Sequence, residues 1–171
     1  MHASTSMDSL LLRHVWRATP ASFAERLSGG RWVRKPHLEL ISDILADAAY
    51  AGDKRIILSA PPRHGKSEEV SRWAPAWFLD TFPDRRVISC SYAAKIARRW
   101  GRQVRNIATR NSDVLRFALA PDSKAADAWE TVDGGGMTTA GVGGPITGLG
   151  AHLFLIDDPI KNWKEAYSET V

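Results

Sequence analysis

A short loop between two expected elements carries residue types that bind phosphate groups. Residues 59–67 read Ser-Ala-Pro-Pro-Arg-His-Gly-Lys-Ser, after an expected strand and at the start of an expected helix. In the pattern G-x-x-x-x-G-K-[ST], glycine lets the backbone approach a phosphate, and the helix N-terminus offers free N–H groups. Lys66 adds positive charge, and Ser67 adds a hydroxyl that can ligate magnesium. Ala60 replaces the first glycine, so the alternative is a proline-rich turn before a helix that begins Gly-Lys-Ser.

Two consecutive acids end a later apolar run. Leu153-Phe154-Leu155-Ile156 is followed by Asp157 and Asp158, and Asp157 lies 157 − 66 = 91 residues after Lys66. Phosphoryl transfer needs a carboxylate near the phosphate loop for the magnesium shell and a neighbour that positions the attacking water. We assign the first role to Asp157 and the second to Asp158. A buried strand that turns at Pro159 is the plain alternative, but the loop and the acids together predict nucleotide hydrolysis.

Strands that alternate with helices must position these residues. The run of residues 55–59 suits a central strand covered on both faces. Because strands and helices alternate, the sequence predicts an α/β fold with a parallel sheet. Strands are expected at 55–59, 86–92 and 152–156, helices at 21–27, 36–51, 66–79 (bent or divided by Pro75) and 93–109, and short strands and turns at 113–150.

Composition excludes several classes of protein. The chain has 171 residues, which favours one compact domain, and its net charge is +4. Its single cysteine, Cys90, rules out an intramolecular disulfide framework, favours a reducing compartment, and is interpreted as a small buried side chain. No apolar stretch approaches the roughly 20 residues that span a bilayer, and Met1–Ser9 lacks the features of a secretory signal.

These motifs resemble the ATPase domain of phage terminase large subunits, the motors that package viral DNA. The likeness runs from about Trp32 to the last residue. It implies a P-loop NTPase with an additional strand between the Walker strands and a mostly parallel sheet flanked by helices, incomplete at its C-terminus. The stretches that carry it are Pro36-His37-Leu38, residues 60–68, the strand and helix of 87–105 with Ser91-Tyr92 and Gly101-Arg102, and Gly148-Leu149-Gly150 leading to 155–161.

The resemblance also implies roles for the site residues. Asp157 is the Walker B acid, and it shares the magnesium ion with Ser67. Asp158 occupies the catalytic position, where many relatives carry glutamate. Arg63 lies where relatives direct a basic residue at the γ-phosphate, and a solvated arginine is the alternative. The ATP-binding set is Pro62, Arg63, His64, Gly65, Lys66, Ser67 and His37, with His37 either recognising adenine or only starting a helix.

The helix expected at 93–109 has a basic outer face. At 100° per residue Arg98, Arg102 and Arg105 share one side, while apolar residues share the other. Such a face suits the phosphates of double-stranded DNA or a neighbouring subunit, and a merely solvated face is the third possibility.

The domain organisation follows from the same resemblance. Residues 1–35 are expected to be an irregular lead-in and 36–171 a truncated ATPase domain, since only 171 − 158 = 13 residues follow Asp158. The coupling motif and the nuclease domain of the family would come later, so no DNA cleavage is expected. The implied partners are a portal protein, a small terminase subunit and further copies in a ring, in the cytoplasm of a bacterial host. The alternatives are an inactive prophage remnant that binds DNA or packaging partners, and a helicase-like DNA translocase.

Overall fold

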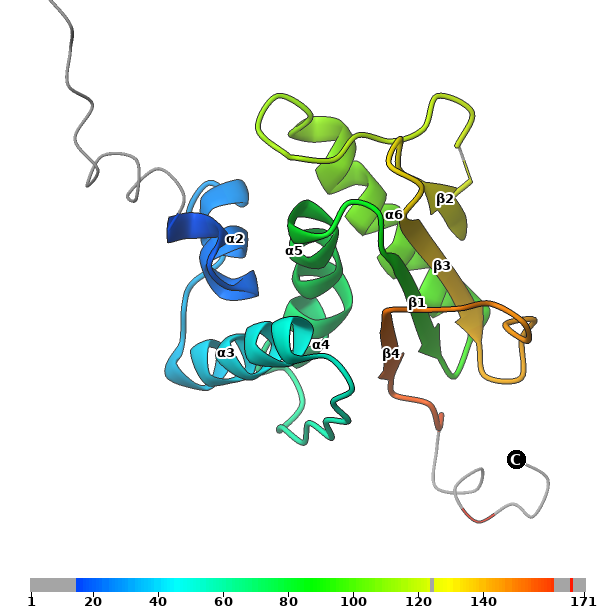
Figure 1. The fold of residues 1–171 in the computed structure, drawn as a ribbon. Coiled ribbons are helices and arrows are strands. Elements are labelled where there is room, and N and C mark those ends of the chain that lie inside the picture. Colours follow the sequence, from blue (N-terminus) through cyan, green and yellow to red (C-terminus); the bar gives the residue numbers. More distant parts are fainter. Residues whose placement is uncertain (1–14, 124, 162–166, 168–171) are drawn as a thin grey trace, which may run out of the picture.

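A four-stranded sheet packs against helices in the computed structural model, which describes residues 15–123, 125–161 and 167 (Figure 1). The expectations for Met1–Ser9 lie outside the described residues. In chain order the elements are the 3₁₀ turn η1 (Val15–Arg17), α2 (Pro20–Leu27), α3 (Pro36–Ala51), α4 (Lys66–Glu68), the π-helical turn η2 (Glu69–Trp73), α5 (Ala74–Thr81), β1 (Arg86–Ser91), α6 (Ala94–Arg110), β2 (Ala128–Glu130), β3 (Gly136–Gly141) and β4 (Leu153–Asp157).

The sheet confirms the predicted α/β class and its mostly parallel character. Its strand order is β2-β3-β1-β4. The central strand β1 pairs in parallel with both β3 and β4, and β2 is antiparallel to β3 at one edge. The register sets Ser91 beside Asp157, so the carboxyl ends of β1 and β4 lie together. Residues that follow these strands therefore share one edge of the sheet.

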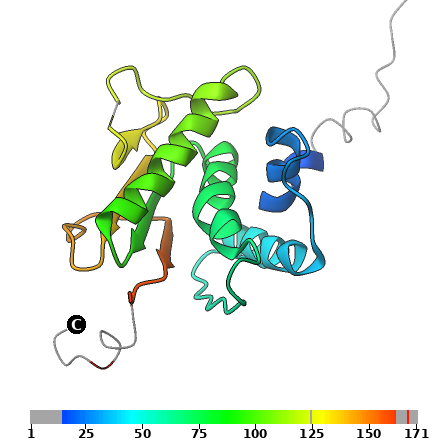
Figure 2. The ribbon, with the colours of Figure 1, turned by 180° about the vertical axis from the view of Figure 1, so that it is seen from behind.

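The two faces of the sheet are covered unequally. Helix α6 lies across β1 and β3 with α5 beside it (Figure 2). On the opposite face Ile88, Cys90 and Ala140 form a small cluster with Ile146. The neighbouring β4 side chains Phe154 and Ile156 are 50% and 54% exposed. Among the described residues, helices thus cover one face only.

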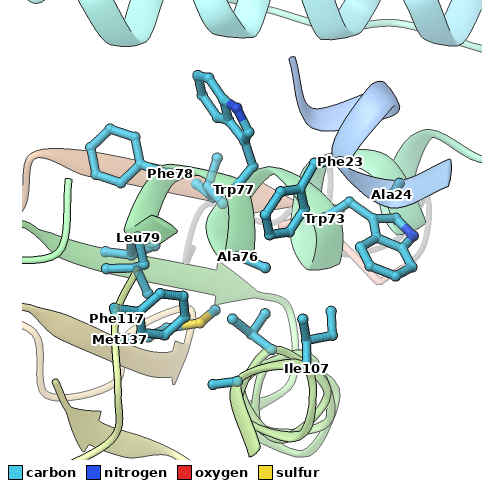
Figure 3. Close-up of a cluster of buried hydrophobic side chains, with 14 of the residues drawn as sticks. Phe23, Ala24, Trp73, Ala76, Trp77, Phe78, Leu79, Ile107, Phe117 and Met137 are labelled. Atoms are coloured by element: carbon cyan, nitrogen blue, oxygen red, sulfur yellow. The ribbon is translucent and has the colours of Figure 1, made fainter. Parts of the chain in front are cut away.

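Aromatic side chains dominate the main core. Trp73, Trp77 and Phe78 pack with Phe23 of α2 and with Ile107 of α6 (Figure 3). Helix α2 begins with a capping box between Thr19 and Ser22. Because Phe23 and Ala24 are fully buried, α2 belongs to the same core as the helices that follow. The core also receives Met137 and Leu155 from the sheet.

The other predicted helices form close to the expected positions. Pro36 opens α3, and Gly52, with φ of 68°, ends it. Helix α6 buries Trp100, Val104 and Ile107, as the periodicity predicts, and it exposes Arg98 and Arg102, whereas Arg105 is half-buried. None of the helices in the described ranges is long and apolar enough to cross a membrane.

The helical stretch predicted at 66–79 has an internal change of winding. α4 passes into the π-helical turn η2 and then into α5, which has Pro75 in its first turn. Proline has no N–H for the preceding turn and its ring crowds the carbonyl four residues earlier. A widened turn just before Pro75 relieves that crowding, so the predicted division occurs there as a π turn rather than a break.

The strand predicted at 55–59 is wrong. These residues are a loop with no strand pairing, and Ile57 is 97% exposed (Figure 1). Strand preference becomes a strand only where another strand is in reach, and here β4 pairs with β1 alone among the described residues. The left-handed φ of Gly52 and Asp53 and the prolines at 61 and 62 further bend the chain around this run. The expected central strand is therefore absent.

Candidate functional site

The loop of residues 60–65 turns sharply into α4. Gly65 has φ of 86°, a left-handed conformation that favours glycine. A Cβ on Gly65 would lie 3.2 Å from Leu38 Cδ1 and 3.6 Å from the ring of Trp32. The N–H groups of Gly65 and Lys66 have no hydrogen-bond partner within the part of the chain that the structure describes. Two N–H donors are therefore available at a helix start, where anions are favoured.

The first helical residues meet the end of β4. Ser67 Oγ donates to Asp157 Oδ1 at 3.1 Å. Lys66 Nζ lies 3.9 Å from the same oxygen and 3.3 Å from Asp158 Oδ1. The structure thus brings together the four residues that the sequence assigns to phosphate, metal and water, although about 90 positions separate the two pairs.

A hydroxyl that sequence reasoning missed also contacts Asp157. Ser71 Oγ donates to Asp157 Oδ2 at 3.0 Å, and both residues are buried. The signal in the sequence was its spacing of four from Ser67, which places both hydroxyls on one side of a helix. That spacing has meaning only once β4 is known to lie beside the helix.

Arg63 and Asp158 have unusual backbone conformations. Their φ values are 62° and 46°, in the region that residues with a Cβ rarely adopt. Such strain concentrates at functional sites. The carbonyl of Asp158 accepts a hydrogen bond from the N–H of Tyr92 at 3.1 Å, which ties the end of β4 to the residue after β1. The Asp158 side chain is two-thirds exposed and faces the loop lysine.

Two histidines lie at the mouth of the loop. His37 Nε2 donates to the carbonyl of His64 at 2.9 Å, and His64 Nδ1 donates to the carbonyl of Pro62 at 2.8 Å. The two rings meet edge to face. His37 therefore touches the loop backbone directly from the first turn of α3.

The loop and the start of α4 border an open cavity of about 380 Å³. Its lining runs continuously from Ala60 to Glu68 and also includes Asp158. Loop backbone, lysine and acid thus face one space, large enough for the phosphate part of a nucleotide.

A protein-family model matches the segment of the chain that contains this site. The family model for the terminase large subunit, T4likevirus-type, N-terminal, matches residues 57–171, more than half of the chain.

The chain belongs to the terminase large-subunit family.

Membership places this N-terminal region in viral genome packaging. The match includes the loop, α6 and β4. No curated protein and no solved structure matches the chain.

The sequence alone indicated no role for one buried acid of this terminase region, Glu69. Glu69 is completely buried two residues after Ser67, and its N–H donates to the carbonyl of Gly65 at 2.9 Å. Burial raises the pKa of Glu69 to about 8, and the Ser42 hydroxyl opposes that shift. Sequence reasoning missed Glu69 because an acid next to Glu68 is expected to be solvated.

The basic face of the terminase helix α6 is partly engaged. Arg98 forms an ion pair with Asp127 at 2.9 Å, and Arg105 Nη1 donates to the carbonyl of Ala125 at 2.9 Å. Arg102 is exposed between them.

Cys90, expected to be buried, is buried on β1, and burial raises the pKa of its thiol.

Proposed function

We propose that this terminase region binds and hydrolyses Mg-ATP at the loop of residues 60–67, and that hydrolysis drives the packaging of double-stranded viral DNA. The observation that carries the proposal is the meeting of Lys66 and Ser67 with the two acids at the end of β4. A lysine and a hydroxyl at a helix start, facing paired carboxylates at a strand end, are groups that phosphoryl transfer uses.

The residues present fit a magnesium nucleotide. Ser67 and Asp157 would hold the metal ion, whose charge, when bound, offsets that of the phosphate oxygens. The free N–H groups of Gly65 and Lys66 and the ammonium of Lys66 would bind the phosphates. Pro62 and His64 line the same cavity and shape the loop around it.

Asp158 and Arg63 are the proposed catalytic residues. Asp158 lines the cavity with a side chain that is two-thirds exposed, so its carboxylate can orient a water. Its side chain is one methylene shorter than glutamate, so it reaches about 1.5 Å less far, one carbon–carbon bond. Arg63 lines the cavity and can offset the charge that develops during transfer. His37 is proposed to contact the base end of the nucleotide, since it stands at the loop mouth.

Nucleotide binding tests the phosphate loop. Equilibrium binding of ATP with Mg²⁺ is measured for the wild type, Lys66→Ala and the control Lys54→Ala, an exposed lysine outside the cavity. Loss of a charged hydrogen-bond donor should weaken binding by roughly 10- to 100-fold in Lys66→Ala only. Equal affinity of all three proteins would refute the proposal.

Turnover tests the assignment of Asp158. Phosphate release by Asp158→Asn should fall by about 10²–10⁴-fold, while ATP binding persists, because loss of general-base help affects the reaction rather than the bound state. Wild-type turnover in this variant would exclude Asp158 as the water-orienting residue.

For the partners, we propose that the outer face of α6 contacts the DNA backbone. Arg102 is the exposed arginine between two that are already engaged, so Arg102→Ala should weaken duplex binding more than Arg98→Ala or Arg105→Ala. The loss should be independent of DNA sequence and smaller at high salt. Contacts with a portal protein, a small subunit and neighbouring copies in a ring remain proposals from the family alone.

A further inference from the structure

The hydroxyl of Ser71 lies beneath the nucleotide site, where nothing in the phosphate-loop pattern requires one. Ser71 is 0% exposed, and its Oγ lies 3.0 Å from Asp157 Oδ2. Ser67, which belongs to the pattern, contacts the other oxygen, Oδ1. Each oxygen of this carboxylate therefore receives its own hydroxyl donor.

Helix geometry explains why the two donors converge. Ser67 and Ser71 are four residues apart along α4 and η2, so their side chains leave the helical stretch on the same side. The turn η2 packs against β4, at whose end Asp157 stands. The pair of hydroxyls thus reaches one carboxylate from two successive turns.

The two contacts give the carboxylate a fixed orientation. Oδ2 points to the buried Ser71, whereas Oδ1 points to Ser67 and lies 3.9 Å from Lys66 Nζ. A hydrogen bond from a hydroxyl to a charged carboxylate is stronger than one between neutral groups, and Asp157 is itself only 6% exposed. Without Ser71, Oδ2 would be buried without a donor and the carboxylate could rotate about its last bond.

We propose that Ser71 is a positioning residue of the magnesium-nucleotide site, which binds Oδ2 of Asp157 and so keeps Oδ1 directed at Ser67. This inference rests on the proposed function, because it concerns the same site. Partners that orient a metal ligand commonly change metal affinity by about 10–100-fold when removed.

The test is a magnesium titration of ATP binding by the full chain. Ser71→Ala should need about 10-fold more Mg²⁺ for half-maximal binding than the wild type. Binding of ATP in EDTA should be unchanged, since the loop itself is intact. Ser71→Thr, which retains the hydroxyl, should return the magnesium requirement toward the wild-type value, and Ser71→Cys, of similar size with a weaker donor, should lie between.

Ser42→Ala is the matched control. Ser42 is also 0% exposed, and its Oγ accepts the N–H of Ala21 at 2.7 Å without contact to Asp157. Both alanine variants should lower thermal stability, but only Ser71→Ala should change the magnesium requirement. A purely structural serine would affect stability alone.

The outcomes separate this inference from the proposed function. Lys66→Ala is run in the same assay. If Lys66→Ala loses ATP binding and Ser71→Ala keeps the wild-type magnesium curve, the role of Ser71 is overturned and the ATP site stands. If Lys66→Ala binds ATP as the wild type does, both ideas are overturned.

Discussion

Two segments, one before and one after the loop of residues 60–67, are both rich in apolar residues, but the first is exposed and the second is buried. Residues 55–59 form an exposed loop in which Ile57 is 97% exposed. Residues 74–79, after the loop, are all buried. Just before the later segment, Ser67 and Ser71 bind Asp157 at the end of β4, and within it Trp77 packs in the main core. The earlier segment has no backbone hydrogen bond to another described segment. Apolar composition therefore buries a segment only where a complementary surface receives it.

The largest loss of stability is expected from a substitution in the buried segment. Trp77 is 1% exposed, and its Nε1 donates to the carbonyl of Arg17 at 2.8 Å. Trp77→Ala should lower the free energy of unfolding by about 3–5 kcal/mol, because it leaves a large cavity and removes the hydrogen bond to the Arg17 carbonyl. Denaturant unfolding measures this, with Trp77→Phe as a milder control. A loss below about 1 kcal/mol, the average for any substitution, would mean that this segment is not the core.

The second largest effect is expected at Glu69, the buried acid that begins η2, just before the buried segment. Glu69 has a pKa of about 8, raised by burial, against a model-peptide value of 4.5. Between these two values the folded protein keeps a proton that the unfolded chain has lost, so the free energy of unfolding falls as pH rises. The steepest slope is about 1.4 kcal/mol per pH unit for one proton. Above pH 8 this slope disappears.

Glu69→Gln should remove that slope, because the amide does not titrate. Unfolding is measured from pH 5 to pH 8 for the wild type, Glu69→Gln and the control Asp43→Asn, which changes an exposed acid of α3. Asp43→Asn should retain the wild-type slope. An unchanged slope in Glu69→Gln would show that Glu69 is solvated, and the contrast between the segments would weaken.

A smaller effect is expected at the junction between the segments. Gly65→Ala forces a Cβ into a left-handed conformation and within 3.2 Å of Leu38, so it should cost about 1–2 kcal/mol. Gly150→Ala is the control, since a Cβ there meets nothing within 4 Å. Thermal unfolding of the two variants measures the difference. Equal melting temperatures would indicate that the loop adopts another conformation in solution.

The smallest change in stability is expected from a substitution in the exposed segment, residues 55–59. Ile57→Ser should change the free energy of unfolding by no more than about 0.5 kcal/mol, because an exposed side chain without neighbours contributes little. Denaturant unfolding against the Trp77 variants gives the scale. A loss of about 2 kcal/mol, typical of a buried aliphatic residue, would place this segment inside the structure after all.

Periodicity predicted most of the fold. The apolar spacing of Trp100, Val104 and Ile107 gave α6, and the runs at 86–92 and 152–156 gave the parallel pair β1 and β4. The run at 55–59 looked the same as these strands. A pattern of side chains records a preference for burial, but it does not say whether a partner strand is present.

The sequence predicted the main residues of the candidate site but not the contacts that hold them in place. Lys66, Ser67, Asp157 and Asp158 were found from motifs, and the structure places each of them within 4 Å of at least one of the others. Ser71 and Glu69 were missed, since their importance depends on β4 and α3 lying against η2. Such contacts join residues far apart in the chain, so the spacing of neighbouring residues cannot predict them.

The uncovered face of β4 has a consequence for the behaviour of the chain in solution. Phe154 and Ile156 project from a strand whose outer edge has no neighbour in the described residues. An edge strand with apolar side chains invites a second molecule to pair with it. Purified material should therefore form larger species as its concentration rises, and a lysine in place of Ile156 should keep it monomeric.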